Sequence, residues 1–467
     1  MHAGNLQWAV FLGLTALVAG LTWWRCRVAR HDTNSSREFF LAGGGLSWVF
    51  VAGSLLLTNI SAEQIVGMNG AQMLLVAWWE FGAAVGLLIL ARVLIPLYYQ
   101  YGCTTTTELL EKRFGDAGIR AAVSLLFLLG YLFILLPVVL YTGSVFMKSM
   151  FQLEYSVVTI AAWFAAAGLA YAAFGGLRAI AISDTFNGIG LLVMGLLVTF
   201  FAMQAIDWDL SGIPVERLSL IGADDSDIPW HTLLTGMVFI HLFYWGTNMV
   251  IAQRAMAARS VREAQKGIYA AAAFKMIIPA VVVLPGVIAF KLYGDVGDVA
   301  YGKLVGDVLP AWLSGAFAAV ITGAVLSSYN SCLNSAAALY TCDLHVKYIN
   351  PKANVKRIGQ WVAVLFTLGS VALVPVYEHA RSIVDTMQRL NGLYSMPVLA
   401  VFIAAVFFHR RIDARMAKLG LLFGALLYAL FTFVWTPLHY IHLMFITLCS
   451  SLALMWIGSR LFPKPAT

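Results

Sequence analysis

Residues 53–70 read GSLLLTNISAEQIVGMNG, and this stretch departs from the apolar sequence around it. The segment 45–70 is otherwise long and apolar enough for a transmembrane helix, which needs about 20 such residues. Within it, the polar run from Thr58 to Gln64, flanked by glycines, interrupts the pattern. Unwound backbone at membrane depth is tolerated only where it is buried in protein or lines a cavity. We therefore predict a broken helix that borders a binding site.

The composition of the whole chain predicts an all-α integral membrane protein. Hydrophobic residues make up 61% of the 467 residues, charged residues make up 11%, and the mean hydropathy is +0.82. A soluble domain carries about 25% charged residues. The net charge of +7 then reflects basic loops at the membrane surface and not nucleic-acid binding. The five cysteines are scattered, so we expect neither a disulfide framework nor a metal site.

Apolar segments recur along the chain, and we interpret residues 1–467 as a single transmembrane domain. With about 20 residues needed per span, the sequence predicts about thirteen spans. They lie near 5–25, 45–70, 72–96, 119–147, 155–177, 184–206, 230–253, 267–292, 310–341, 358–377, 382–409, 416–436 and 438–459.

The basic residues predict the orientation in the inner or plasma membrane. Cytoplasmic loops collect Lys and Arg, and most of the 30 Lys and Arg fall in alternate loops, such as 254–266 with Arg254, Arg259, Arg262 and Lys266. The connection 207–229 is acidic, as an outside loop can be. This segregation places the N-terminus outside and the C-terminus in the cytoplasm.

A second interruption lies in the segment 230–253, where residues 241–248 read HLFYWGTN. Paired broken helices in corresponding halves point to the binding site of a secondary transporter. We therefore predict two inverted five-helix repeats, over 45–206 and 230–409. One helix (5–25) precedes them, and two (416–459) follow.

Polar and charged side chains inside the predicted spans are further site candidates, because a charge at the bilayer centre costs roughly 2.5–3.5 kcal/mol. Lys275 is a counter-charge for two carboxylates on neighbouring spans, although snorkelling to the membrane surface is an alternative. A position near the headgroups is the alternative for Asp184. The candidates are Glu63, Gln64, Glu80, Asp184, Lys275 and Gln388.

The segment 310–341 carries ITGAVLSSYNSCLNSAAALYTCD. Ala324, Ser327 and Ser328 lie at i, i+3 and i+4 and share one helix face. Two hydroxyls and a freed carbonyl are oxygen ligands suited to an alkali cation. Serines in membrane helices more often bond to their own backbone or pack as small residues. The spacing alone favours this second explanation.

Several motifs together resemble the solute:sodium symporters, especially the sodium/sugar branch of sodium/glucose or galactose cotransporters. The resemblance covers nearly the whole chain in order, and it implies an inverted-repeat symporter of a monosaccharide, not an enzyme, with Na+ as the coupling ion and no cofactor. The motifs are TNISAEQIVGM, WEFGAAV, TELLEKRFG, GGLRAIAISDTFNG, FYWGTNMVIAQR, AFKMIIPAVVVLPG, VLSSYNSCLNSAAALYTCD and MQRLNGLYSMPVLAVF.

The resemblance also implies roles for individual residues. It assigns solute binding to Gln64, Glu80, His241, Tyr244, Lys275 and Gln388. It assigns an inner gate to Tyr244 with Asn59 as its hydrogen-bond partner, and an outer gate to Met68 and Trp79. Sodium is held by the carbonyls of Leu57, Ile60 and Ala324 and the hydroxyls of Ser327 and Ser328.

Two positions depart from the pattern of this family. His241 stands where better-known sugar transporters have Asn or Thr. Asn330 stands where members with a second sodium site have Ser or Thr, so that site would comprise Asp184, Ser327, Asn330 and Ser331. Alternatively, Asp184 pairs with Arg178 or guides sodium on its way.

Other functions stay open on the sequence. Within the transporters, inositol, sialic acid or another polar organic solute is the alternative to a sugar. A membrane-embedded enzyme could use His439 and His442, at i and i+3, to bind a metal, but no carboxylate or cysteine lies near them. A channel is disfavoured because no filter motif is present. The expected partners are a small solute, sodium and membrane lipid, with no nucleic acid.

Overall fold

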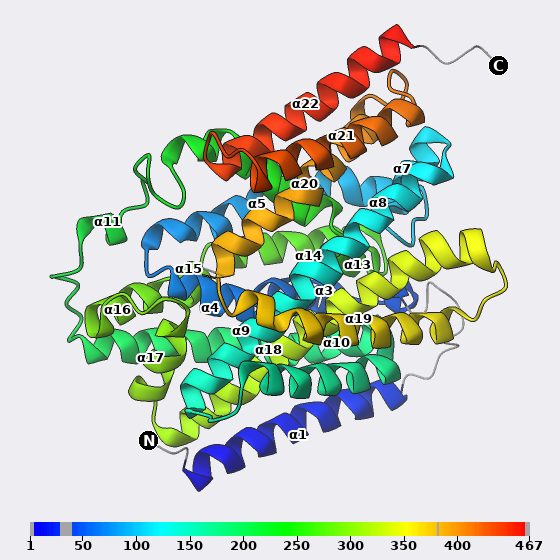
Figure 1. Ribbon diagram of the computed structural model, residues 1–467. Coiled ribbons are helices and arrows are strands. Elements are labelled where there is room, and N and C mark those ends of the chain that lie inside the picture. Colours follow the sequence, from blue (N-terminus) through cyan, green and yellow to red (C-terminus); the bar gives the residue numbers. More distant parts are fainter. Residues whose placement is uncertain (1–3, 29–39, 381–382, 463–467) are drawn as a thin grey trace.

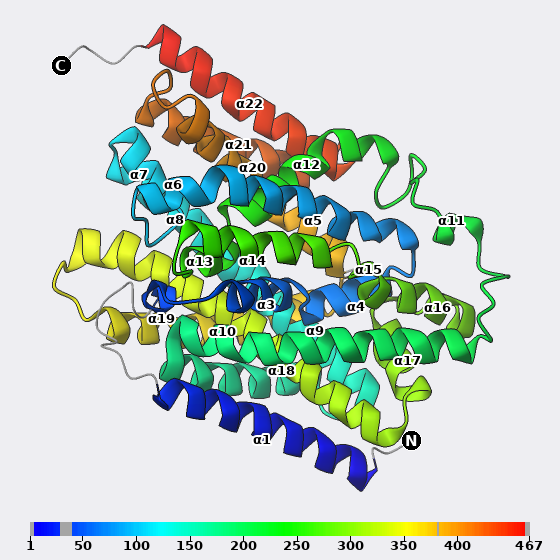
Figure 2. The same ribbon diagram turned by 180° about the vertical axis from the view of Figure 1, so that it is seen from behind.

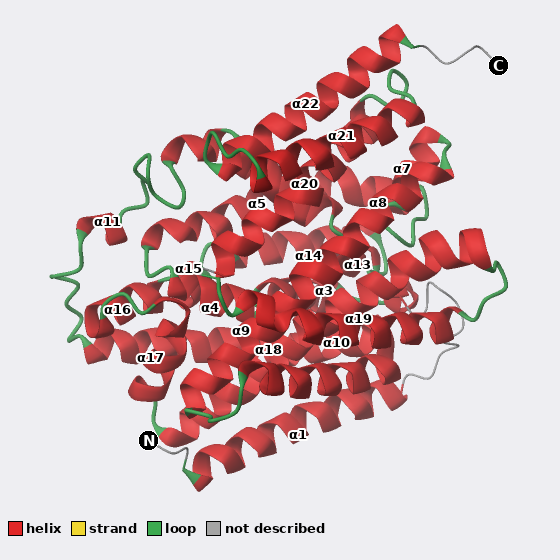
Figure 3. Cartoon of the chain, viewed as in Figure 1, coloured by secondary structure: helices red, strands yellow, loops and turns green. Residues whose placement is uncertain are grey.

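The computed structural model describes residues 4–28, 40–380 and 383–462. The described residues fold into helices joined by short loops, and no strand forms among them (Figure 3). In Figures 1 and 2, α1 (Asn5–Val28) lies along one edge of the molecule, and α22 (Tyr440–Leu461) lies along the opposite edge. This all-α architecture confirms the fold class that the composition predicts.

Eight helical stretches of the described chain are long and apolar enough to cross a membrane, or nine with the pair α14 (Val261–Phe274) and Pro279–Tyr293, which is bent by 49°. They confirm a multi-pass membrane protein, while the count of thirteen stays a prediction. The eight stretches are Leu74–Gln100, Ala117–Phe151, Asn187–Ala205, Ala311–Ile349, Val355–Tyr377, Ile383–Phe407, Ala414–Phe433 and Tyr440–Leu461.

The other expected spans lie on helices that are short, that are broken, or that cover two spans without a loop between them. The spans expected at 155–177 and 184–206 both lie in α10 (Val157–Ala205), which is helical over 49 residues. A straight helix of that length would measure about 70 Å, more than twice the hydrocarbon thickness. The stretch therefore holds enough residues for both spans, although no loop separates them.

The break expected near Thr58–Gln64 is present. Helix α3 (Trp48–Asn59) ends at Ile60, whose ψ of 73° is not helical, and Ser61 is extended before α4 (Ala62–Gly70) begins. The chain thus turns out of the helix within the predicted polar run and resumes a new helix after it.

The second expected break is also present. Helix α12 (Gly236–His241) continues into a π-helical turn, η6 (Leu242–Thr247), and Asn248 is extended before α13 (Met249–Met256). The Asn248 side chain accepts a hydrogen bond from the Val250 N–H at 3.1 Å and another from the Tyr131 hydroxyl at 2.7 Å. The side chain of Asn248 therefore caps the new helix and satisfies the interrupted backbone.

Both broken helices lie inside the bundle, in contact with helices from the other predicted half of the chain (Figures 1 and 2). Helix α3 packs against α10, α13, α14 and α18 (Ala311–Ala338). Helix α4 packs against α9 (Leu136–Phe151), α16 (Leu284–Tyr293), α17 (Ala300–Val308) and α20 (Ile383–Phe407). The other main helices are α5 (Trp78–Ile89), α6 (Ile95–Gln100), α7 (Glu108–Phe114), α8 (Ala117–Gly130), α15 (Pro279–Val282), α19 (Val355–Tyr377) and α21 (Ala414–Phe433).

A close contact fixes α4 against α16. The Asn69 side-chain oxygen accepts a hydrogen bond from the Gly286 N–H at 2.7 Å, and the Asn69 amide donates to the Ile65 carbonyl at 2.8 Å. A Cβ on Gly286 would lie 2.2 Å from the Asn69 carbonyl oxygen. Only glycine lets the two backbones approach this closely.

We predict that Gly286→Ala lowers the thermal stability of the detergent-purified protein, because overpacking of this kind costs about 1–3 kcal/mol. Gly13→Ala is the matched control, since nothing lies within 4 Å of the added methyl group in α1. Equal melting temperatures for both variants would show that the α4–α16 contact is not tight.

Candidate functional site

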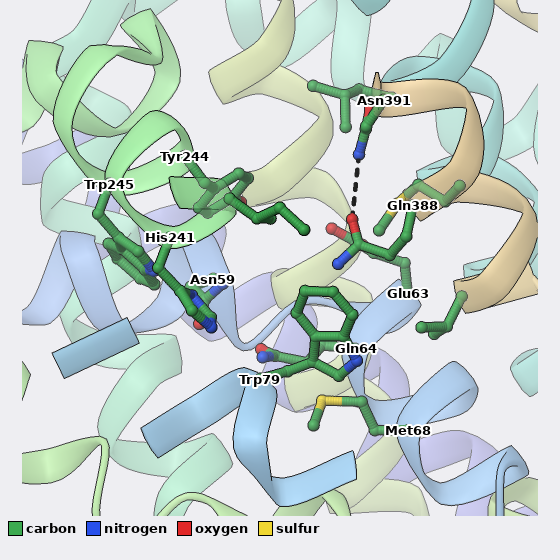
Figure 4. A pocket seen from close by; sticks show the side chains of 14 residues that line it. Asn59, Glu63, Gln64, Met68, Trp79, His241, Tyr244, Trp245, Gln388 and Asn391 are labelled. Carbon is green, nitrogen blue, oxygen red and sulfur yellow. Dashed lines mark hydrogen bonds between the residues drawn. The ribbon is translucent and has the colours of Figure 1, made fainter. Parts of the chain in front are cut away.

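A pocket lies between the two broken helices and α20 (Figure 4). It encloses about 670 Å³ of space between protein atoms, including the part open to solvent. Figure 4 shows His241 and Tyr244 projecting from the α12–η6 helix, across from Gln388 and Asn391 on α20. The lining residues are Asn59, Glu63, Gln64, Met68, Trp79, Leu135, Ile240, His241, Tyr244, Trp245, Val384, Met387, Gln388 and Asn391.

Most of the solute-binding and gate residues expected from the sequence meet in this pocket. They come from four separate segments, and two of these segments, α3–α4 and α12–η6, line the pocket beside their breaks. The expected residues that line it are Asn59, Gln64, Met68, Trp79, His241, Tyr244 and Gln388.

Glu80 and Lys275 lie behind the lining and pair with each other. Their charged groups are 2.6 Å apart, and both side chains are fully buried. Gln64 donates a hydrogen bond from its amide to the second oxygen of Glu80. The resemblance assigns both residues to solute binding, but neither lines the pocket, and each buried charge is compensated by the other.

Two residues that line the pocket contact this ion pair. Gln64 lines the pocket and bonds to Glu80. Trp245 also lines the pocket, and the Lys275 ammonium lies 4.9 Å from the centroid of its ring. Such a cation–π contact is favourable when the cation is desolvated.

Glu63 lines the pocket and has a buried carboxylate oxygen with no hydrogen-bond partner in the described part of the chain. The sequence analysis counted Glu63 among the charged site candidates, but the family resemblance assigned it no role. The expectation that Lys275 compensates both carboxylates holds only for Glu80.

Asn391 is a lining residue that the sequence analysis missed. Its amide donates to the Gln388 side-chain oxygen at 3.4 Å, and its own oxygen accepts from the Tyr394 hydroxyl at 3.0 Å. The sequence does contain a signal for Asn391, because it follows Gln388 by three residues and therefore shares its helix face.

His241 fits against α5 because two glycines leave room for it. A Cβ at Gly82 would lie 2.2 Å from the His241 ring, and a Cβ at Gly86 would lie 2.6 Å from its carbonyl oxygen. The ring makes an edge contact with Trp79 at 5.8 Å between centroids. His241 also hydrogen-bonds to the backbone of Trp78, while its Nε2 has no partner among the described residues.

The structure places Asn59 beside Tyr244, and their side chains form a hydrogen bond. The Tyr244 ring also packs edge-on against Trp245 at 5.4 Å. The two expected inner-gate residues therefore come from the two different broken helices and meet at the pocket.

The expected sodium ligands lie on α3 and α18, which are in contact. Leu57 is in the last turn of α3 and Ile60 is at its end, where the helix stops. The Ser328 hydroxyl is buried and has no hydrogen-bond partner in the described part of the chain. A cation would satisfy this orphaned oxygen, because hard cations prefer oxygen ligands.

Three residues of the expected second sodium site are joined by hydrogen bonds, and the site itself stays a prediction. Asp184 accepts hydrogen bonds from Ser54 at 2.7 Å and from Ser327. Ser331 lies in the same cluster, but Asn330 faces α10 at Gly168. Arg254, which we counted as a cytoplasmic-loop residue, is instead fully buried in α13 and belongs to this cluster.

His439 and His442 do not form the metal pair that an enzyme would need. His442 Nε2 lies 2.6 Å from His231 Nδ1 and its other nitrogen lies 3.0 Å from the Thr235 hydroxyl. His439 accepts from the Ile441 N–H. Within the described ranges, no three His, Cys, Asp or Glu side chains are grouped to hold a metal.

The family model named "Sodium:solute symporter family" matches residues 39–424. The chain belongs to the sodium:solute symporter family. This family consists of transporters and not of enzymes, and its members couple transport to Na+. The resemblance found in the sequence motifs is therefore confirmed.

Relatives of this symporter are named as symporters or sodium cotransporters. The chain is 36% identical to "Uncharacterized symporter YidK" of Escherichia coli, over 98% of this chain and 84% of that protein. It is 30% identical to the sodium/glucose cotransporter of Vibrio parahaemolyticus, over 86% and 80%. It is 29% identical to the sodium/myo-inositol cotransporter 2 of Oryctolagus cuniculus, over 91% and 69%.

Solved structures support the fold of the symporter. A substrate-bound, outward-open structure of a Na+-coupled sialic acid symporter superposes with a TM-score of 0.83 over 99% of both chains, at 18% identity. The nucleobase-cation-symport-1 transporter Mhp1 gives a TM-score of 0.59 over 93% of this chain and 97% of that chain, at 15% identity. At these identities, the comparison concerns the fold alone.

We predict that Lys275→Met destabilises the symporter, because stranding one member of a buried ion pair costs about 3–5 kcal/mol. The double variant Glu80→Gln/Lys275→Met removes both charges and should recover most of the lost melting temperature in detergent. A double variant as unstable as the single one would contradict a compensating role for the pair.

Proposed function

We propose that this sodium-coupled symporter imports a monosaccharide by alternating access. The observation that supports this solute most directly is a set of buried pocket acceptors without donors. The Asn59 side-chain oxygen, one Glu63 oxygen and the Gln64 side-chain oxygen have no hydrogen-bond partner in the described chain. A solute rich in O–H groups supplies the donors that these acceptors lack.

The remaining pocket chemistry supports the same class of solute. Gln388 and Asn391 add amide groups opposite, and Trp79, Tyr244 and Trp245 add aromatic surface for the apolar face of a sugar ring. The solute-binding set is then Gln64, Glu80, His241, Tyr244, Lys275 and Gln388, with Glu80 and Lys275 acting through Gln64 and Trp245.

Inositol is the second candidate, because it offers the same hydroxyl donors and because relatives are named as myo-inositol cotransporters. Sialic acid is less suited to this pocket, since it carries a carboxylate. The described lining includes Glu63 but no lysine or arginine. An anionic solute would meet unpaired acceptors and a carboxylate with no free cation beside them.

We place the coupling sodium at the carbonyls of Leu57, Ile60 and Ala324 and the hydroxyls of Ser327 and Ser328. The end of α3 at Ile60 frees backbone carbonyls, and the orphaned Ser328 hydroxyl adds a side-chain ligand. One sodium crossing 100 mV provides about 2.3 kcal/mol, and a tenfold gradient adds about 1.4 kcal/mol. These terms together support roughly a few hundredfold accumulation of solute.

The proposal includes the finer architecture that the sequence predicts. Thirteen spans comprise inverted repeats at 45–206 and 230–409, flanked by 5–25 and 416–459. The N-terminus lies outside and the C-terminus lies in the cytoplasm, with the protein in the cell membrane. Tyr244 with Asn59 closes the pocket on the inner side, and Met68 with Trp79 closes it on the outer side.

We predict that Ser328→Ala lowers the apparent sodium affinity at least tenfold, which corresponds to about 1.4 kcal/mol. The measurement is the sodium dependence of solute uptake into proteoliposomes. Ser314→Ala is the matched control on the same helix, because Ser314 bonds to Gln7 and not to the site. An unchanged sodium dependence in Ser328→Ala would remove Ser328 from the ligand set.

We predict that proteoliposomes take up labelled glucose or galactose along an inward sodium gradient, more than myo-inositol or sialic acid. Glu80→Gln should weaken solute affinity, because Gln64 loses a charged acceptor. Lys275→Ala should weaken it more, since the substitution also strands Glu80. Tyr244→Phe should have a smaller effect, because the aromatic ring remains.

Glu154→Gln is the control for these solute measurements, since Glu154 is an exposed carboxylate outside the pocket. Normal hexose transport by both Glu80→Gln and Lys275→Ala would mean that the solute site lies elsewhere. Sodium-driven uptake of sialic acid but not of hexose would overturn the sugar assignment while leaving the symporter intact.

A further inference from the structure

Arg254 is a charged residue that the proposed solute and sodium sites do not use. Its side chain is fully buried in α13, six residues after the extended Asn248. The guanidinium donates hydrogen bonds to the Val250 carbonyl and to the Ser331 hydroxyl. It also lies 3.8 Å from the Asp184 carboxylate.

The groups around Arg254 form a closed cluster of oxygen atoms. Asp184 accepts from Ser54 at 2.7 Å and from Ser327, and it is fully buried. Ser331 uses its own proton for the Ser327 carbonyl at 2.6 Å, so its oxygen is free to accept from Arg254. The cluster thus brings together a carboxylate, three hydroxyls and a backbone carbonyl.

These oxygens are the kind of ligand set that holds an alkali cation, and three of the residues are those that the sequence predicts for a second sodium site. The fourth is Asn330, whose two side-chain polar atoms have no hydrogen-bond partner among the described residues and whose oxygen faces Gly168. A sodium ion at Asp184 would lie beside the Arg254 guanidinium.

We propose that Arg254 is a tethered cation that takes the place of a second sodium ion at Asp184. The buried carboxylate is then compensated by a charge that belongs to the protein, as buried charges require. Arginine suits this position because it stays charged and presents several donors in a fixed plane. The symporter binds one sodium ion, at the site that includes Ser328.

The contacts of Arg254 and Asp184 also distinguish the serines of α18 from one another. In the described state, Ser327 donates to Asp184, and Ser331 accepts from Arg254. Ser328, one residue further along the helix than Ser327, is left with an unpartnered hydroxyl. Arg254 and Asp184 therefore engage the Ser331 oxygen and the Ser327 proton, while the lone pairs of Ser327 and the Ser328 hydroxyl stay available for the transported ion.

The test is the number of sodium ions bound per purified full-length protein, measured with radioactive sodium at equilibrium. This measurement requires no solute, so it is independent of the sugar assignment. We expect one ion for the wild type and one for Arg254→Lys, which keeps the charge. We expect two for Arg254→Gln, because Asp184 and its hydroxyls are then free to bind sodium. The double variant Asp184→Asn/Arg254→Gln should return to one.

Two ions on the wild type would overturn the proposal without any variant. A folded Arg254→Gln protein that binds one ion would also overturn it. If Arg254→Gln does not fold, Arg254→Met takes its place with two ions expected, and one ion on a folded Arg254→Met protein would overturn the proposal. Absence of sodium binding in every form, with normal melting temperatures, would contradict the proposed sodium site itself, and this result differs from both of the others.

Discussion

The structure depends on one constraint: backbone N–H and C=O groups in a membrane have no water to bond with. Helices satisfy this constraint along most of the described chain, and the pocket forms beside two of the breaks in the helices. At one break, the Asn248 side chain caps α13 and accepts from Tyr131. At the other, Ile60 leaves carbonyls free at the end of α3. The site is thus built from non-helical backbone, which is tolerated at membrane depth only inside the protein or along a cavity.

Buried charges obey a similar constraint, and their pairing links the two predicted repeats. Glu80 in the first repeat pairs with Lys275 in the second, and Asp184 pairs with Arg254 in the same way. A third pair, Arg120 with Asp343 at 2.6 Å, again has one member in each repeat. Each pair compensates a charge that would be costly alone. If the repeats move against each other during transport, each of these three ion pairs must either break or move with both of its helices.

The sequence predicted the parts of the site that depend on local chemistry. Glycines and polar residues within apolar segments located both breaks, and charges in spans pointed to Glu80 and Lys275. The parts that depend on packing were not predictable in this way. Only the tertiary fold shows that Lys275 compensates Glu80 and not Glu63, and that Arg254 lies beside Asp184. Arg254 was misplaced because hydropathy ends the span at residue 253, whereas α13 continues to Met256 inside the protein.

The balance of hydrogen-bond donors and acceptors in the pocket restricts the class of solute further than family membership does. The Gln64 amide is already committed to Glu80, so its remaining oxygen can only accept. His241 bonds to the Trp78 backbone, and its Nε2, which has no partner among the described residues, is a further polar atom at the pocket. The unpaired acceptors at the α3–α4 break therefore require donors from the solute, while the amides of Gln388 and Asn391 can serve either way. Leaving such acceptors unpaired costs about 1–3 kcal/mol each, so a solute with several hydroxyls fits this pocket better than one whose polar groups mainly accept.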